Sequence, residues 1–206
     1  MNVALFGATG GTGRELVKKL LHEGHHVTAL ARTPKKLADL ADHNLLVMQG
    51  DVLEQQDVLK TVDNTSAVIV SLGTTDNNPD NVVSEGTRLI IEAMDIVNTD
   101  RLIVVTSLGV GDSKDQVPFA FKLIMKTVLR KVMADKNVQE QYVRDSGLEW
   151  TIVRPGGLTD GPATGQYKIS TGSDITAGQV SRADVADFIV QELETSNFVH
   201  LAVAIT

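Results

Sequence analysis

Seven residues near the start of the chain, Gly7-Ala8-Thr9-Gly10-Gly11-Thr12-Gly13, join a short apolar run to a segment with helical periodicity. Glycine at position 7 allows a tight backbone turn, and glycine at position 13 allows the helix to lie close to the strand before it. Glycine at position 10 permits close approach of a ligand, and the N-terminus of the helix offers unpaired N–H groups to phosphates. An ordinary tight turn has similar glycines, so the position between strand and helix is what predicts dinucleotide binding.

Short apolar runs alternate with helical patterns along most of the chain. The runs are nearly continuous in apolar residues, which is typical of strands that are covered on both faces. The expected strands are 3–6, 27–30, 45–48, 67–70, 102–105 and 151–153, and the expected helices are 14–23, 34–41, 54–62 and 82–97. This order predicts an α/β fold, a Rossmann-like doubly wound parallel sheet in a single domain over residues 1–206. Ligands bind such sheets at the carboxyl ends of the strands.

After residue 153 the strand pattern gives way to a stretch rich in glycine and threonine that reaches Gly178. A helix is expected over 181–193 and a last strand over 198–203. This part is too short for a second domain. We therefore expect residues 154–206 to form a short C-terminal segment that caps the substrate side.

The composition excludes several classes of function. A net charge of −7 over 206 residues argues against a nucleic-acid partner. The absence of cysteine excludes disulfides and thiolate chemistry. The clustered His22, His25 and His26 lack the further ligands of a metal site, so C-capping and surface positions and no metal are expected. No run of about 18 apolar residues and no signal-like start occur. We expect a cytoplasmic protein, monomeric or a small homo-oligomer, with small-molecule partners and no membrane association.

The end of the second expected strand distinguishes between the two nicotinamide dinucleotides. Proteins that bind NAD carry an acidic residue there for the ribose 2′-hydroxyl. This chain has Arg32 at that point, with Lys35 and Lys36 just after it. A guanidinium pairs well with a 2′-phosphate, which favours NADP. The alternative is that the three cations form the solvated start of a helix.

Two further turns fit the same cofactor. Asp51 follows the third strand and can accept a hydrogen bond from the adenine amino group, while the N–H of Val52 can donate to the ring. Asp51 also fits a cap of the next helix, and the two roles are compatible. Leu72 and Gly73 follow the fourth strand, where a small residue lets the backbone pass beside the cofactor ribose.

The fifth strand leads into Thr106-Ser107, where a serine lies next to the nicotinamide in this type of sheet. Many short-chain dehydrogenases pair such a serine with the motif Y-x-x-x-K. Lys136 lies on the following helix, but Val132 stands where the tyrosine would be, and Tyr142 has serine instead of lysine four residues later. The tyrosine acid of alcohol–ketone chemistry is therefore absent, and Tyr142 is expected in the core or at the rim.

Ser107 and Lys136 remain as candidate catalytic residues. Val105 and the turn Pro155-Gly156-Gly157 complete the expected nicotinamide end. Such a platform suits acceptors that need little acid catalysis, and flavins, quinones and conjugated tetrapyrroles are acceptors of this kind.

The chain resembles the atypical short-chain dehydrogenase/reductases that include the flavin reductase/biliverdin-IXβ reductase family. The similarity runs through 6–13, 50–53, 67–73, 84–86, 106–107 and 146–148. The resemblance implies that Arg32, Lys35 and Lys36 hold the 2′-phosphate, that Asp51 and Val52 hold adenine, and that Ser107 lies beside the nicotinamide. The family's histidine after the sixth strand is replaced by Arg154-Pro155-Gly156-Gly157. Together with Lys136 and Glu140, this turn is more similar to the NmrA-like NAD(P)-binding branch.

Two functions follow from these patterns. The first is an NADPH-dependent reductase of a flavin, tetrapyrrole, quinone or similar conjugated acceptor. The second is an NmrA-like regulatory protein that senses NADP(H) without turnover. Lys122, Lys126 and Arg130 form a stripe that is either the wet face of a helix or a basic flap for an anionic planar acceptor.

Overall fold

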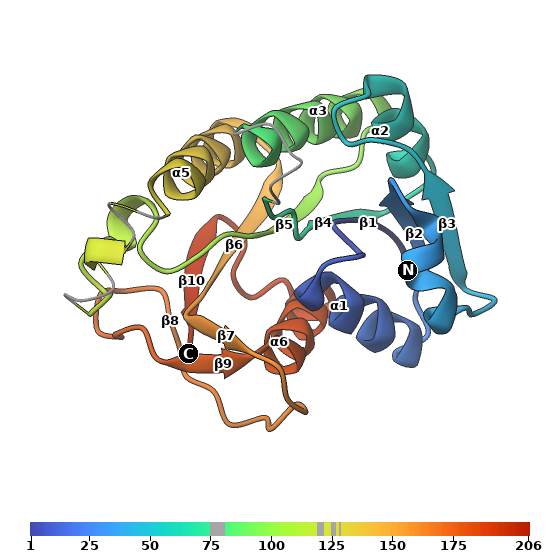
Figure 1. Ribbon diagram of the computed structural model, residues 1–206. Helices are drawn as coiled ribbons and strands as arrows, with labels where there is room; N and C mark the ends of the chain where they lie inside the picture. Colours follow the sequence, from blue (N-terminus) through green and yellow to red (C-terminus); the bar gives the residue numbers. More distant parts are fainter. Residues whose placement is uncertain (75–80, 119–121, 125–126, 128) are drawn as a thin grey trace.

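The computed structural model describes residues 1–74, 81–118, 122–124, 127 and 129–206. In this part of the chain, eight strands form a sheet in the order β3-β2-β1-β4-β5-β6-β10-β8 (Figure 1). Neighbouring strands are parallel except for β10 and β8, which are antiparallel. The strands of this sheet are β1 (Asn2–Phe6), β2 (His26–Ala31), β3 (Leu45–Gln49), β4 (Ala67–Val70), β5 (Arg101–Val105), β6 (Glu149–Pro155), β8 (Ile169–Ser170) and β10 (Leu201–Ile205).

Helices cover both faces of the sheet, as Figure 1 shows. The α-helices are α1 (Gly11–His22), α2 (Gln55–Val62), α3 (Val82–Val97), α5 (Arg130–Asp145) and α6 (Arg182–Thr195). Alternate strand residues point to opposite layers: Leu5 and Ile103 pack against α1 and α6, whereas Phe6 and Val104 pack against α2, α3 and α5. The predicted doubly wound sheet in one domain is confirmed. Among the described helices, none combines the length and apolar character that a bilayer crossing requires.

The segment after β2 differs from the expected helix in its type. Residues Pro34–Leu40 form a 3-10 helix, η1, and a second short one, η2, covers Gly111–Ser113. Leu37 is the buried residue of η1. A segment that buries one side chain gains little from the wider apolar face of an α-helix, and the tighter turn suffices to connect two neighbouring strands.

The C-terminal part of the chain divides between two places. The helix α6 packs beside α1, and β10 pairs with β6, so both belong to the central layers and not to a cap. The stretch between β6 and α6 contains the two-stranded parallel sheet of β7 (Gly157–Thr159) and β9 (Gln179–Ser181). This stretch starts at the carboxyl end of β6 and passes the carboxyl end of β10. There Lys168 and Thr206 exchange backbone hydrogen bonds of 2.8 and 3.0 Å. The substrate-side segment expected over 154–206 is thus narrowed to the loops between β6 and α6, because α6 and β10 complete the sheet and its helix layer.

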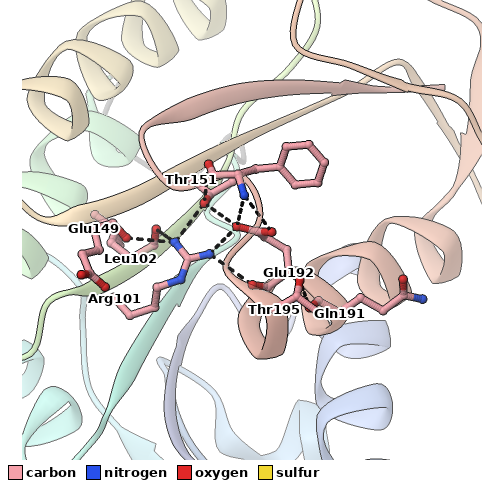
Figure 2. Close-up of polar contacts among 8 residues, drawn as sticks. Arg101, Leu102, Glu149, Thr151, Gln191, Glu192 and Thr195 are labelled. Carbon is pink, nitrogen blue, oxygen red and sulfur yellow. Dashed lines mark hydrogen bonds and ion pairs between the residues drawn. The ribbon is translucent and has the colours of Figure 1, made fainter.

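A buried ion pair holds the amino ends of β5 and β6 to α6 (Figure 2). The Arg101 guanidinium donates from Nη2 to Glu192 Oε1 at 2.7 Å and from Nη1 to Thr151 Oγ1 at 2.9 Å. Thr151 in turn donates to the same Glu192 oxygen at 3.0 Å. This cluster lies at the edge of the sheet opposite to the carboxyl ends of the strands, where ligands bind in folds of this kind.

Candidate functional site

The glycine turn after β1 has the geometry that its sequence predicts. Gly7 has φ of +85°, and a Cβ placed on it would lie 2.2 Å from the carbonyl oxygen of Ser71. A Cβ on Gly13 would lie 2.1 Å from the carbonyl oxygen of Gly7. A side chain at either position therefore clashes with backbone, whereas the nearest atom to a Cβ on Gly10 is 3.4 Å away. The turn brings α1 against β1 and leaves the surface of Gly10 open.

A cavity of about 310 Å³ lies beside this turn, and we call it the glycine-turn cavity. It collects residues that follow β1, β2, β3 and β4 at their carboxyl ends. Those expected from the sequence are Gly7, Thr9, Gly10, Arg32, Lys36, Asp51, Val52, Leu72 and Gly73. The lining also includes residues that the sequence did not single out as ligand contacts, namely Phe6, Leu30, Ala31, Gly50, Ser71, Thr74 and Val82. The structure thus brings four separate turns to one cavity.

The other predicted residues of this end lie beside the cavity and do not line it. Gly11, Thr12 and Gly13 form the first turn of α1. The N-cap, Gly10, makes no side-chain hydrogen bond, and the first turn carries no acidic residue. The early N–H groups of α1 therefore have no partner within the helix and are available to an anion. Lys35 is exposed and outside the lining.

The cations at the end of β2 have a neighbour that the sequence analysis missed. Arg14, on α1, donates to the carbonyl oxygen of Lys36 at 2.5 Å and forms an ion pair with Asp39. These contacts fasten the start of η1 to α1 and so position Arg32 and Lys36 at the cavity. Arg14 directly follows Gly13, the last glycine of the turn, and this position is the sequence signal that identifies it.

Asp51 stabilises its own turn. Its Oδ1 accepts a hydrogen bond from the N–H of Leu53 at 3.0 Å, and its own N–H donates to Asp57 Oδ2 at 3.0 Å. The expected cap of the next helix is therefore wrong for Asp51: Glu54 is the N-cap of α2, and Asp51 caps the turn before it. Because Asp51 lines the cavity as well, the carboxylate lies where a ligand can reach it.

A second group of residues lies at the carboxyl ends of β5 and β6. Lys136, on α5, donates from Nζ to the carbonyl oxygen of Val105 at 3.5 Å. Burial lowers the pKa of Lys136 to about 8, although the charges of Glu140 and Asp135 act to raise it. The Ser107 hydroxyl donates to the carbonyl oxygen of Leu108 at 3.1 Å. The two candidate catalytic residues therefore meet at the same strand end, each bonded to the backbone.

The turn after β6 lies directly beside the turn after β5. The carbonyl oxygen of Pro155 accepts from the N–H of Leu108 at 2.9 Å, and the N–H of Gly156 donates to Ile205 at 2.9 Å. A Cβ on Gly156 would lie 2.6 Å from the carbonyl oxygen of Gly178, so only glycine permits this close approach. The N–H of Gly157 donates to the same oxygen at 2.8 Å. These bonds join the two turns to the strands β9 and β10.

An ion pair between α5 and β6 supports this end of the site. Arg154 donates from Nε to Glu140 Oε1 at 2.9 Å and from Nη2 to Glu140 Oε2 at 2.5 Å. The Thr106 hydroxyl donates to Glu140 Oε1 at 2.8 Å, and Arg154 Nη1 lies 2.5 Å from Asp112 Oδ1. Glu140 thereby holds the residue next to Ser107. The sequence showed both charged residues but not their contact.

This arrangement of turns is that of a nucleotide-binding sheet, and comparison with known proteins agrees. A profile of the NAD(P)H-binding family matches residues 7–196. The chain belongs to this family. The match covers the glycine turn, both strand ends that carry Ser107 and Pro155, and α6, so the ligand that family membership indicates is a nicotinamide cofactor.

Relatives in this family match almost the whole chain. An uncharacterized chloroplast protein of Arabidopsis thaliana is 31% identical over 95% of this chain and 74% of its own length. The uncharacterized sugar epimerase YhfK of Bacillus subtilis is 29% identical over 96% of this chain and 90% of its own length. The crystal structure of the anaerobilin reductase ChuY from Escherichia coli O157:H7 has a TM-score of 0.85 at 28% identity and covers 100% of this chain and 96% of ChuY. The expected membership of the atypical short-chain dehydrogenase/reductases is confirmed.

Three other predicted features have different outcomes. Tyr142 packs at the edge of the core under α2, α3 and α5, which confirms its expected place in the core or at the rim. His25 is buried, with Nδ1 3.2 Å from the N-terminal ammonium and Nε2 3.3 Å from Glu194, so the expected surface position is wrong for this histidine. Of the basic stripe, Lys122 forms an ion pair with Asp115 at 2.8 Å, and Lys126 lies outside the described residues.

Proposed function

We propose that the protein is an NADPH-dependent reductase that transfers a hydride to a flavin, tetrapyrrole, quinone or similar conjugated acceptor. The observation that carries the proposal is the placement of Arg32 and Lys36 in the lining of the glycine-turn cavity. An acidic residue at this place would bind a ribose 2′-hydroxyl, whereas two cations bind a 2′-phosphate. The cofactor, when bound, supplies the hydride.

The residues of the chain then have distinct roles. The first turn of α1 provides N–H groups for the diphosphate, and Asp51 and Val52 contact adenine. Ser107 lies beside the nicotinamide. Lys136 holds a proton at Nζ, and a pKa of about 8 allows it to release that proton near neutral pH. Because no tyrosine acid stands four residues before Lys136, the site suits acceptors whose conjugated system spreads the incoming charge.

Relatives support this class of acceptor. ChuY, which resembles the chain over its whole length, is an anaerobilin reductase. A bilin falls within the conjugated acceptors that the site suits. The direct test mixes purified protein with NADPH and, in turn, FMN, FAD, a quinone or biliverdin, and follows absorbance at the NADPH band. We expect oxidation with at least one acceptor, and a protein that binds NADPH but reduces none of them contradicts the proposal.

The choice of cofactor has its own test in the variant Arg32→Ala. Loss of one charge-assisted contact weakens NADPH binding by about 1.5–3 kcal/mol and leaves NADH binding nearly unchanged. Titration calorimetry with both nucleotides measures this difference. Lys35→Ala is the matched control, because Lys35 lies outside the cavity and its loss is expected to change neither affinity by more than about 0.5 kcal/mol. Equal losses for the two nucleotides in Arg32→Ala would show that Arg32 does not read the 2′-phosphate.

One observation favours a second candidate, a sensor of NADP(H) without turnover. Ser107 and Lys136 are each bonded to a backbone carbonyl, and Tyr142 packs at the edge of the core. A sensor distinguishes NADP from NADPH in binding, whereas a reductase turns over. Unequal affinities for the two redox forms, together with the failure of every acceptor, would support the sensor.

A further inference from the structure

One arginine from the C-terminal part of the chain lies over the glycine turn. Arg182 is the first residue of α6, and its side chain packs on Gly11 at the start of α1. A Cβ on Gly11 would lie 2.6 Å from Arg182 Nε and 2.7 Å from its Cδ. Gly11 has no positive φ, and Arg182 supplies the three nearest atoms of other elements to such a Cβ, so the arginine occupies the space above it.

The neighbouring strands hold the guanidinium in place. Thr159 of β7 pairs with Ser181 of β9, so the residues that follow them, Asp160 and Arg182, lie side by side. Arg182 Nη1 donates to Asp160 Oδ1 at 2.6 Å. Among the described residues Asp160 is the one hydrogen-bond partner of the Arg182 guanidinium, and this bond leaves the Nε and Nη2 protons for another acceptor. Asp160 is 92% exposed, so it orients the guanidinium without burying it.

Among the described residues the first turns of α1, α2 and α5 carry no side-chain cap, whereas those of α6 and α3 do. The N-terminus of α6 is capped by Ser181, whose hydroxyl accepts from the N–H of Asp184 at 2.9 Å. The N-terminus of α3 is capped by Asp135, which accepts from the N–H groups of Val83 and Ser84 at 3.0 Å each. The N-terminus of α1 has no such cap. The uncapped turn, with Arg182 lying on it, combines N–H donors and a guanidinium around one point.

We propose that Arg182 contacts the diphosphate of the nicotinamide cofactor through Nε and Nη2 while Asp160 holds Nη1. The inference rests on cofactor binding at the glycine turn, as in the proposed function, and adds a residue from outside the four turns of the glycine-turn cavity. A guanidinium matches two phosphate oxygens better than an ammonium does. The contact also joins the cofactor to β7 and β9 on the acceptor side.

Titration calorimetry of the purified full chain with NADPH and NADH tests the contact. Both nucleotides carry the diphosphate, so Arg182→Gln raises both dissociation constants by a similar factor, roughly ten- to a hundred-fold. Arg182→Lys keeps the charge but not the fork and gives an intermediate loss. Arg88→Gln is the matched control: Arg88 pairs with Glu85 and Glu92 on α3, and the variant keeps the wild-type constants.

Gly11→Ala tests the same contact without removing the arginine, because its Cβ displaces the Arg182 side chain. We expect weaker binding of both nucleotides in this variant and no further weakening when Gly11→Ala is added to Arg182→Gln. Gly11→Ala alone keeps the arginine, so its effect on the two affinities decides the question even if Arg182→Gln folds poorly.

The outcomes separate this inference from the proposed function. Three outcomes overturn the role of Arg182 and leave the reductase standing. In the first, the wild type binds both nucleotides and Arg182→Gln binds them equally well; in the second, Arg182→Gln weakens the binding of NADPH alone. In the third, Gly11→Ala weakens binding by the same factor with and without Arg182→Gln. Failure of the wild type to bind either nucleotide overturns both. Binding with no acceptor reduced contradicts the reductase alone.

Discussion

Two buried arginine–glutamate pairs join strands of the sheet to helices, one at each edge, and they differ in their surroundings. At the amino edge, Arg101 of β5 meets Glu192 of α6 at 2.7 Å. At the carboxyl edge, Arg154 of β6 meets Glu140 of α5 at 2.5 Å. The side chains of all four residues are at most 7% exposed.

The amino-edge pair, Arg101 and Glu192, is almost fully shielded from solvent. Burial is the largest effect on Arg101 and lowers its pKa, although the charge of Glu192 and their hydrogen bond act to raise it. Its Nε has no hydrogen-bond partner among the described residues. Burial also opposes the charge of Arg154, but the hydrogen bonds and charges of Glu140 and Asp112 outweigh it and raise the pKa of Arg154. Asp112 is 75% exposed, so the carboxyl-edge pair reaches the surface.

This difference separates a structural contact from a contact that serves the site. The Arg101 pair bonds to Thr151 and to the backbone and touches none of the residues that line the glycine-turn cavity. The Arg154 pair bonds to Thr106, beside the candidate catalytic Ser107, and to the turn that carries Asp112. Breaking the first should change stability alone, whereas breaking the second should also change the chemistry.

The largest effect is expected for Glu192→Gln. Arg101 loses the one carboxylate in contact with it and becomes an uncompensated buried charge, which costs about 3–5 kcal/mol. Urea denaturation measures the loss, and titration calorimetry on the folded variant should return the wild-type NADPH affinity. Glu194→Gln, at a half-exposed carboxylate on the same helix, is the control and should cost less than about 1 kcal/mol. A Glu192→Gln protein as stable as this control would show that the amino-edge pair is not the stronger contact.

The sequence predicts features whose cause lies within a few residues. The helix over 82–97 and the strand over 67–70 have the predicted bounds, because a continuous periodic pattern and flanking turns define them. Gly7 and Gly13 can also be predicted, since the clash of a side chain there involves backbone of the same strand–turn–helix unit or the adjacent strand. The places of Arg32 and Lys36 can be predicted in the same way, because both lie within a few residues of the end of β2.

The remaining features depend on which elements become neighbours, and no local pattern shows that. The pairing of β10 with β6 removes α6 and β10 from the expected cap. The contact of Glu140 with Arg154 exists because α5 packs on β6, and Arg182 reaches Gly11 because α6 lies beside α1. Lys35 and Lys36 look equivalent in the sequence, yet the turn of η1 directs one of them to the cavity.

A second, smaller effect is a dependence of stability on pH. We expect it from Lys136 near the carboxyl edge and not from Arg101 at the amino edge. Arginine stays charged throughout the accessible range, so Arg101 at the amino edge should add no pH dependence above neutral pH. The pKa of Lys136 is lowered from 10.5 to about 8 in the folded protein. Between these values the unfolded chain binds more protons than the folded one, so this group makes the folded protein more stable as pH rises from about 8 to 10.5.

The variant Lys136→Met removes this dependence. Below pH 8 it should be more stable than the wild type by roughly 3 kcal/mol, and the difference should shrink as pH rises toward 10.5. Denaturation in urea at several pH values measures the trend, with the exposed Lys60→Met as control. If Lys136 donates the proton, turnover of the wild type also falls above pH 8, and the variant Lys136→Met loses turnover. Parallel stability curves for wild type and variant would show that Lys136 is not desolvated.

The smallest effects on stability are expected at the carboxyl edge itself, from Glu140→Gln and Asp112→Asn. Glu140→Gln leaves Arg154 with Asp112 and keeps an amide oxygen for Thr106, so it should cost about 1–2 kcal/mol, less than Glu192→Gln. Asp112→Asn removes an exposed partner and should cost under about 1 kcal/mol. Turnover should show the reverse of the amino-edge result: Glu140→Gln shifts Thr106 and Ser107 and slows NADPH oxidation roughly ten-fold, because small displacements at a reacting centre are costly. Urea denaturation and turnover measured on the same preparations check both effects. If Glu140→Gln lowers stability as much as Glu192→Gln while turnover stays unchanged, the two pairs have the same structural role and the division between the edges does not hold.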